Sequence, residues 1–191
     1  MKIALDPGHG GIYTGAIGNV PFELQEKDVT LSLCIKIKDL LKAAGHKVIL
    51  TRTRDVHLAT NIRDDIHRRA ALANEANAEV LISIHCNAFS DPNPEGIESW
   101  YKPHSAAAEK FARAIQNALV AKFSNHLNRG VKPKDLLLFR YAQMPACHIE
   151  TEFLTNPAQL EFLASDFNQD AIADAIVRGL LHLSSSPRRR S

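Results

Sequence analysis

The segment that most constrains the fold is the run Glu79-Val80-Leu81-Ile82-Ser83-Ile84-His85. Its apolar residues fall on both faces of an extended chain, so a strand formed here must be covered on both sides. Strands of this kind lie at the centre of parallel sheets that are packed between helices. The run therefore predicts a central strand of an α/β sheet.

Weaker strand and helix signals alternate along the rest of the chain. They predict strands at residues 3–5, 47–51, 97–101, 136–139 and 146–150, and helices at residues 28–44, 62–76, 105–123 and 169–183. Asp28 is the expected N-cap of the first helix, and residues 128–133 are expected to form a loop. This order predicts an α/β fold: a single domain with a largely parallel twisted sheet of about six strands, helices on both faces, in a phosphorylase/hydrolase-like arrangement. We expect the domain to cover residues 1–183, and residues 184–191 to form a disordered C-terminal tail.

The composition excludes several classes of protein. The formal net charge is +2, and without Arg188–Arg190 the chain carries 20 basic and 21 acidic residues, which argues against a nucleic-acid-binding face. Cys34, Cys86 and Cys147 show no C-x-x-C spacing, so neither a disulfide framework nor a zinc knuckle is expected. No stretch approaches the roughly 18 apolar residues of a membrane span. We therefore expect neither nucleic acid nor a membrane span.

Several side chains suited to metal binding fall near the expected carboxyl ends of strands. His9 follows the first strand in the loop D-P-G-H-G-G, and His85 ends the central strand. Glu150 ends the last strand, and Glu26 lies just ahead of the first helix. In open α/β sheets, sites gather beyond these strand ends, and two histidines with a carboxylate are the ligand set of a catalytic zinc site. The alternative is that each histidine has an ordinary role, His9 in a loop and His85 bonded to a backbone carbonyl.

Two other kinds of site fit these residues less well. The loop of residues 6–11 could cradle a phosphate, but it lacks the G-K-[ST] ending of a P-loop. Cys86 and Cys147 could act as nucleophiles, but both lie inside apolar strands, where cysteine is normally an inert packing residue.

Seven motifs occur along the chain in an order that suggests a known family. They are D-P-G-H-G-G at residues 6–11, E-K at 26–27, T-R-T-R-D at 51–55, Arg69 with Ala73-Asn74, S-I-H-C-N-A at 83–88, N-R-G at 128–130 and E-T-E-F-L-T-N at 150–156. With these motifs the chain resembles the zinc-dependent N-acetylmuramoyl-L-alanine amidases of the amidase-3 family over nearly all of residues 1–183, which would then be a catalytic amidase domain.

The resemblance implies both a reaction and a site. It implies zinc-dependent hydrolysis of the amide bond between N-acetylmuramic acid and L-alanine in peptidoglycan. It implies that His9, Glu26 and His85 bind one Zn²⁺ per chain and that Glu150 is the catalytic carboxylate. Glu23 is the rival carboxylate ligand, and Glu26 is preferred because it stands in the E-K motif. Peptidoglycan is the expected partner, and we expect a monomer.

Two residues depart from the pattern of the family. Glu152 stands where glycine is common, and His148 stands where an aliphatic residue is common. Strand alternation places His148 on the same face as Glu150. His148 could simply form a hydrogen bond with a neighbour at the end of the sheet, which is the interpretation we favour, or it could tune Glu150 or the bound water.

The remaining expectations concern access, location and rival functions. Some members of the family carry a helical insertion that occludes the zinc, but residues 89–95 are too few for one, so we expect an open site.

The enzyme should act on the cell wall, in the periplasm or outside the cell. No signal peptide is recognisable, which suggests a holin-released lysin, a mother-cell lysin or a domain excised from a longer protein. The rival functions are a zinc carboxypeptidase or another amidohydrolase on a related sheet, and a non-catalytic wall-binding module.

Overall fold

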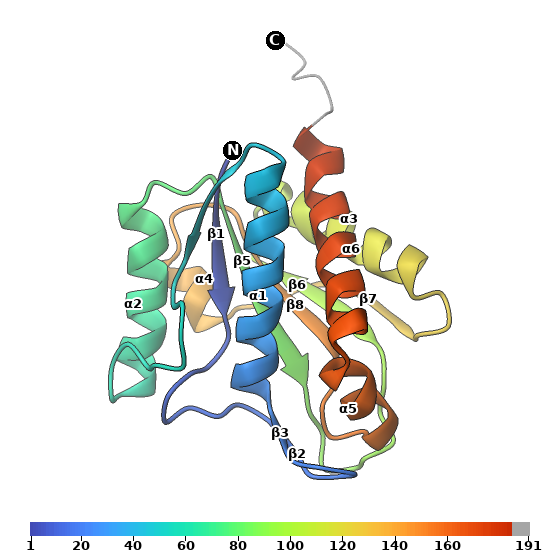
Figure 1. The fold of residues 1–191 in the computed structure, drawn as a ribbon. Coiled ribbons are helices and arrows are strands. Elements are labelled where there is room, and N and C mark those ends of the chain that lie inside the picture. The colour runs from blue at the N-terminus through green and yellow to red at the C-terminus, as the bar shows by residue number, and fades with distance from the viewer. Residues whose placement is uncertain (185–191) are drawn as a thin grey trace.

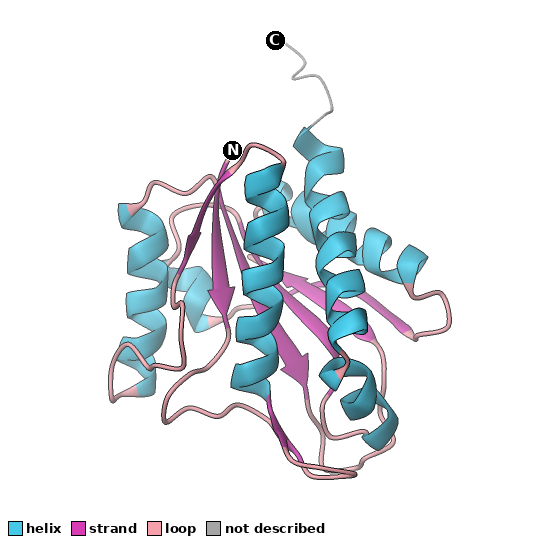
Figure 2. Cartoon of the chain, viewed as in Figure 1, coloured by secondary structure: helices cyan, strands magenta, loops and turns pink. Residues whose placement is uncertain are grey.

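A six-stranded sheet runs through the middle of the structure (Figures 1 and 2). The computed structural model describes residues 1–184. The predicted tail of residues 184–191 therefore lies, except for Ser184, outside the described residues. Across the sheet the strands are β4 (Lys47–Leu50), β1 (Lys2–Pro7), β5 (Val80–Asn87), β8 (Ala146–Phe153), β6 (Ile97–Tyr101) and β7 (Asn128–Pro133). The first four are parallel, whereas β6 pairs antiparallel with β8 and parallel with β7. The predicted, largely parallel sheet of about six strands is confirmed.

Helices cover both faces of this sheet, as predicted. One face is covered by α1 (Glu26–Ala43), α3 (Ala106–Lys122) and α6 (Asp166–Ser184), and the other by α2 (Ile62–Glu75) and α4 (Leu137–Tyr141). Figure 1 shows α1 and α6 side by side in front of the sheet, with α2 at its left edge. The central strand β5 is buried on both sides: Ile82 packs in the core beneath α1, and Leu81 packs against α2 and α4.

The second face is covered unevenly. Its apolar core consists of residues from β1, β5, β8, α2 and α4 and from the loops next to them, and among the described residues it includes none from β6 or β7. On the β6–β7 half, Trp100 is half-buried and the side chain of Lys132 is 51% exposed. This half of the face therefore lies open beside the ends of β5 and β8.

The structure corrects three local predictions. The predicted strand at residues 136–139 is not formed: residues 137–139 belong to helix α4, whose Leu138 and Phe139 pack in one apolar cluster with alanines of α2. Residues 128–133, which were predicted as a loop, form the edge strand β7. Pro133, which has no N–H to donate, is tolerated at the end of this strand because no further strand pairs with its outer side. The first helix begins at Glu26, with Gln25 as its N-cap, so Asp28 lies in the first turn and is not the cap.

Three short elements were not predicted. A two-stranded hairpin, β2 (Ile17–Gly18) with β3 (Leu24–Gln25), lies in the segment before α1. Helix α5 (Pro157–Ala164) follows β8 and carries a clear start signal, since Asn156 caps it and Pro157 occupies its first turn.

A buried polar network lies beneath the loop that follows β1. The carboxylate of Asp6 accepts hydrogen bonds from the hydroxyls of Thr51 (2.6 Å) and Ser83 (2.7 Å) and from the guanidinium of Arg69 (3.1 Å). Arg69 also pairs with Asp65 at 2.6 Å. Burial alone would raise the pKa of Asp6, but the charge of Arg69 and the two hydroxyls lower it to about 2. Asp6 is therefore an ionised, fully paired carboxylate inside the fold.

The same network holds the backbone of the loop. Arg69 donates to the carbonyl oxygens of Pro7 (2.7 Å) and His9 (2.6 Å). Arg52 donates to the carbonyls of Pro7 (3.1 Å) and Gly8 (2.9 Å). Two guanidinium groups thus fix a loop that carries little side-chain bulk of its own.

Replacing Arg69 with methionine should destabilise the fold strongly. The variant leaves Asp6 and Asp65 buried without their cation and removes the donors to two loop carbonyls, so we expect a loss of about 3–5 kcal/mol in the free energy of unfolding. Urea titration followed by circular dichroism measures this. The matched control is Lys36→Met, which breaks pairs with the exposed Asp166 and Asp170 and should cost less than about 1 kcal/mol. Equal, small losses in both variants would contradict the assigned role of Arg69.

Candidate metal centre

His9 lies at the tip of a tight loop after β1. Its backbone has a positive φ of 62°, and Gly10 and Gly11 follow with φ of 133° and 57°. Two backbone hydrogen bonds between Gly10 and Tyr13, of 2.8 and 3.1 Å, close the turn. The Gly11 N–H donates to Asp55 at 2.6 Å. The loop therefore turns the imidazole of His9 back towards the start of α1.

Three N–H groups of this loop, those of its glycines, are already engaged, which argues against a phosphate cradle. Gly8 donates to the carbonyl of Ile84 in β5, Gly10 donates to Tyr13, and Gly11 donates to Asp55. Buried thiols also fail as nucleophiles, because burial raises the pKa of Cys86 and of Cys147 well above its usual value. Neither alternative from the sequence is therefore supported.

Two glycines make room for the candidate ligands. A Cβ atom on Gly8 would overlap the ring of His85. A Cβ atom on Gly15 would overlap both the carboxylate of Glu26 and the ring of His9. Any other residue at either position would push a candidate ligand out of place.

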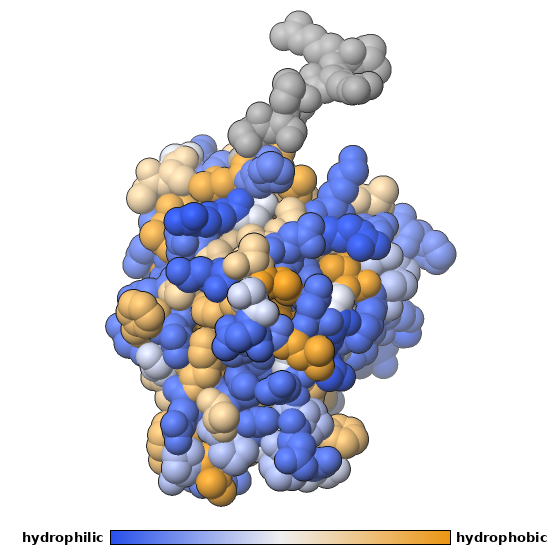
Figure 3. Space-filling model, turned by 90° about the vertical axis from the view of Figure 1, so that its right-hand side faces the viewer, coloured by the Kyte–Doolittle hydropathy of each residue, from blue (hydrophilic) through white to orange (hydrophobic). Residues whose placement is uncertain are grey.

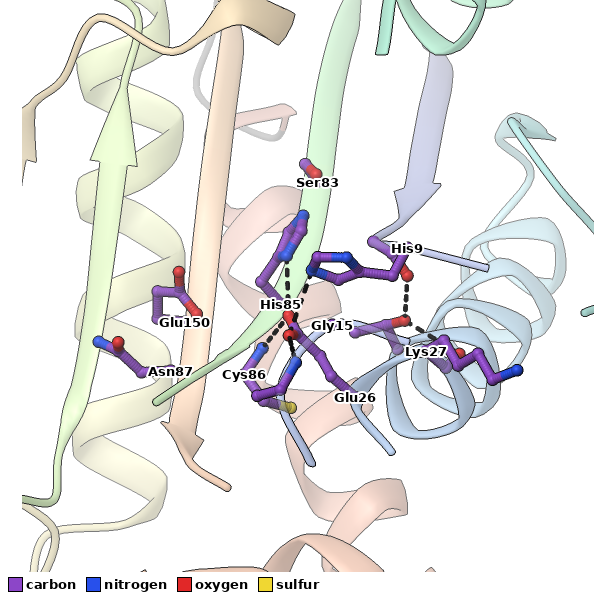
Figure 4. A network of polar contacts seen from close by, with 12 residues as sticks. His9, Gly15, Glu26, Lys27, Ser83, His85, Cys86, Asn87 and Glu150 are labelled. Atoms are coloured by element: carbon purple, nitrogen blue, oxygen red, sulfur yellow. Dashed lines mark hydrogen bonds and ion pairs between the residues drawn. The ribbon is translucent and has the colours of Figure 1, made fainter. Parts of the chain in front are cut away.

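Glu26, the first residue of α1, lies between the two histidines (Figure 4). Its Oε2 is 3.2 Å from Nε2 of His9, and its Oε1 is 2.8 Å from Nδ1 of His85. Backbone N–H groups of Ala16 (2.8 Å) and Cys86 (3.0 Å) donate to the same two oxygens. Burial would raise the pKa of Glu26, but hydrogen bonding and charge from His85 and His9 lower it below its ordinary range. The carboxylate is therefore ionised and held in a fixed orientation.

The three side chains fit a metal ion. His9, Glu26 and His85 each present one ligand atom, and the three atoms lie within 4.8 Å of one another. Tetrahedral zinc, with bonds of about 2.0–2.2 Å, needs ligand atoms separated by about 3.3 Å, so small side-chain shifts suffice. Glu23 lies outside this cluster and bonds to Gln25 at the surface. The structure therefore brings together the three predicted ligands and leaves out the rival one.

Glu150 lies on β8, opposite His85 of the neighbouring strand β5. Figure 4 shows it apart from the cluster of ligands, on its own strand. Its Oε1 is 2.8 Å from Nε2 of His148, whereas its Oε2 is buried with no hydrogen-bond partner among the described residues. Burial raises the pKa of Glu150 to about 8. A buried carboxyl group with a raised pKa and an unpartnered oxygen, on the strand next to the candidate ligand His85, is a candidate for proton transfer.

His148 lies in the middle of a row of stacked rings. Its ring stacks on that of His85, with centroids 4.1 Å apart and planes 16° apart, and on that of Trp100, at 4.8 Å and 19°. Burial lowers the pKa of His148 to about 3, so its imidazole is neutral. The group that His148 contacts is Glu150 itself.

Sequence reasoning did not find the polar residues on β6 and β7. Glu98 is the antiparallel partner of Glu150, and its carboxylate accepts from Asn87 (2.8 Å) and Lys132 (2.6 Å). The alternation of Glu98 and Trp100 along one strand was a usable signal, because it places both on one face. The proximity of Glu98 and Trp100 to Glu150 depends on the antiparallel direction of β6, and no local sequence pattern predicts strand direction.

The site can be reached from solvent, as expected. The side chains of His9 and His85 are 27% and 18% exposed. A cavity of about 170 Å³ opens onto both histidines and His148, and its apolar wall comes from α2 and from residues 136–138. Residues 89–96 contain no helix.

Comparison with known proteins gives a consistent result. A family model described as N-acetylmuramoyl-L-alanine amidase matches residues 3–182. The chain is 35% identical to the germination-specific N-acetylmuramoyl-L-alanine amidase of Bacillus subtilis, over 94% of this chain and 78% of that protein. It is 33% identical to the amidase LytC of the same organism, of which it spans only 34%. The crystal structure of an N-acetylmuramoyl-L-alanine amidase from Clostridium difficile 630 superposes with a TM-score of 0.88 at 31% identity, covering 97% of this chain and 98% of that one. From these matches and the geometry of the site, the chain belongs to the amidase-3 family of N-acetylmuramoyl-L-alanine amidases.

Proposed function

We propose that this amidase cleaves the bond between N-acetylmuramic acid and L-alanine of peptidoglycan with one Zn²⁺ held by His9, Glu26 and His85, and with Glu150 as the catalytic carboxylate. The observation that carries the proposal is the convergence of two imidazoles on one buried carboxylate, with Glu150 on the adjoining strand. Nitrogen and carboxylate donors suit zinc, and three protein ligands leave a position open.

The roles of the residues follow from their surroundings. When bound, zinc polarises the scissile carbonyl and lowers the pKa of a water molecule and of nearby carboxyl groups. Glu150 then takes a proton from the attacking water and passes it to the nitrogen of the leaving L-alanine. Its unpartnered Oε2 is the oxygen free for that exchange.

The contact between His148 and Glu150 supports a tuning role for the histidine. The 2.8 Å hydrogen bond engages Oε1 of Glu150, and the stacked rings on either side restrain the imidazole. His148 thereby holds one oxygen of the carboxyl group and leaves the other for the reaction.

The cellular location and the oligomeric state that we propose are based on the family and on the surface of the protein. Members of the family act on the cell wall, and we propose action outside the membrane, as a holin-released lysin, a mother-cell lysin or a domain of a longer wall enzyme. None of the helices in the described part of the chain is long and apolar enough to cross a membrane. On the face shown in Figure 3, hydrophobic residues form small separate groups among hydrophilic ones, which supports the proposal of a monomer.

Digestion of purified peptidoglycan tests the reaction. The enzyme should release free L-alanine amino termini, because the cleaved bond joins that amine to the lactyl group. A chelator should abolish the release, and added Zn²⁺ should restore it. Labelling of new amino termini, followed by mass spectrometry, identifies the bond. Release of terminal residues from free peptides, with muropeptides intact, would favour the carboxypeptidase instead.

Replacing Glu150 with glutamine separates metal binding from turnover. The amide keeps the shape of the side chain but cannot take up a proton, so kcat should fall by about 10²–10⁴-fold while one zinc per chain is retained. Metal analysis and turnover on muropeptides measure the two effects. His9→Ala is the complementary variant, and it should lose zinc as well as activity. Full activity of Glu150→Gln would contradict the mechanism. Inactivity of the wild-type enzyme on muropeptides would instead favour a non-catalytic wall-binding module.

A further inference from the structure

An ammonium group lies at the outer end of the row of stacked rings. Nζ of Lys134 is 3.0 Å from the centroid of the Trp100 ring. Trp100 stacks on His148, and His148 stacks on the candidate ligand His85. We call these four residues the Lys134 row. The row links the candidate metal centre to the open half of the sheet.

Lys134 has no anionic partner of its own. Within residues 1–184, no carboxylate lies within 4.0 Å of its ammonium group, whereas its neighbour Lys132 pairs with Glu98 at 2.6 Å. Lys134 is exposed, yet its ammonium group lies on an aromatic face, where a cation–π contact favours this position. The row therefore presents a positioned cation whose charge is not neutralised.

The cation also lies close enough to act on the catalytic carboxylate. Its charge opposes the burial that raises the pKa of Glu150, and it adds to the burial that lowers the pKa of His148. Any group that binds Lys134 therefore lies on the open half of the sheet, at the outer end of the row of rings that begins at His85.

We infer that Lys134, seated on Trp100, binds a carboxylate of the stem peptide and makes the amidase selective for muropeptides with a free carboxylate near the scissile bond. This inference rests on the proposed function. The separations along the row are 4.1, 4.8 and 3.0 Å. An extended peptide spans about 3.3–3.6 Å per residue, so the second or third residue of the stem reaches the ammonium group. In peptidoglycan the second residue carries a carboxylate, and the third carries one where it is a diamino diacid; these carboxylates are free in some cell walls and amidated in others.

Matched substrates test the inference. One muropeptide carries D-glutamate as its second stem residue, and its partner carries D-isoglutamine at that position and is otherwise identical. A second pair differs only by amidation of the carboxylate on the third residue. Wild-type enzyme should show a KM about 3–10-fold lower for the free carboxylate of one pair, and this preference should shrink as salt is raised. The pair that shows the preference identifies which residue Lys134 binds.

The variant Lys134→Met keeps an apolar chain beside Trp100 and removes the charge. It should raise KM about 3–10-fold for the free-carboxylate substrate and leave KM for the amidated substrate unchanged. Any change in kcat that arises from the lost charge near Glu150 should be equal for the two substrates. Lys134→Arg should retain the preference. The control Lys110→Met removes an exposed lysine from α3 on the opposite face of the sheet and should change neither substrate.

Binding measurements separate this inference from the proposed reaction. Isothermal titration of the same muropeptides into Glu150→Gln, with and without Lys134→Met, reports the preference without turnover. Equal effects of Lys134→Met on free and amidated substrates, or no preference in the wild type for either pair, would overturn the inference. If Glu150→Gln binds the free-carboxylate substrate preferentially but the wild-type enzyme does not cleave the muramoyl–alanine bond, the inference stands and the proposed reaction is wrong.

Discussion

Arg69 lies beneath the loop that carries His9 and holds it through charge and through backbone contacts. Its guanidinium group pairs with Asp6 and Asp65 inside the fold and donates to the carbonyls of Pro7 and His9. A buried cation with two carboxylates is tolerated only while each partner is present. The pairing therefore permits one loop conformation, and the position of His9 relative to the other candidate ligands is its consequence.

The start of α1 supplies the second half of the same arrangement. Glu26 occupies the first helical position, where unpaired N–H groups and the positive end of the helix dipole favour a carboxylate. Lys27, the next residue, donates to the carbonyl of Gly11 and pairs with Asp55, which accepts from the N–H of Gly11. The helix that supplies one candidate ligand thus also restrains the loop that supplies another. Adjacent residues of the E-K motif therefore have separate contacts: Glu26 lies in the candidate metal site, and Lys27 restrains the loop.

The sequence predicted the parts of the structure that have long or repeated local signals. The apolar run ending at His85 and the capped helix after Ser105 appear where their patterns place them. The helical turn at residues 137–141 and the edge strand β7 were missed, because five or six residues carry too little periodicity to distinguish the two states. The shared sheet edge of His9, His85 and Glu150 was predictable from the rule for parallel strands. The stacking of Trp100 on His148 was not, because it requires the antiparallel register of β6 on β8.

That reversal of strand direction has an electrostatic consequence. Because β6 runs opposite to β8, Glu98 at the start of β6 is paired with Glu150 of β8. A third carboxylate, Glu26 at the start of α1, also acts on Glu150 electrostatically. Glu26 and Glu98 both add to the burial that raises the pKa of Glu150, so ionised Glu150 is unfavourable without nearby positive charge. A parallel β6 covered by a crossover helix would bury this region further. The antiparallel pairing leaves it open instead, where Lys132 neutralises Glu98 and Lys134 remains to favour the ionised form of Glu150. The open half of the sheet therefore acts electrostatically on Glu150, the proposed catalytic carboxylate, and leaves the candidate site accessible.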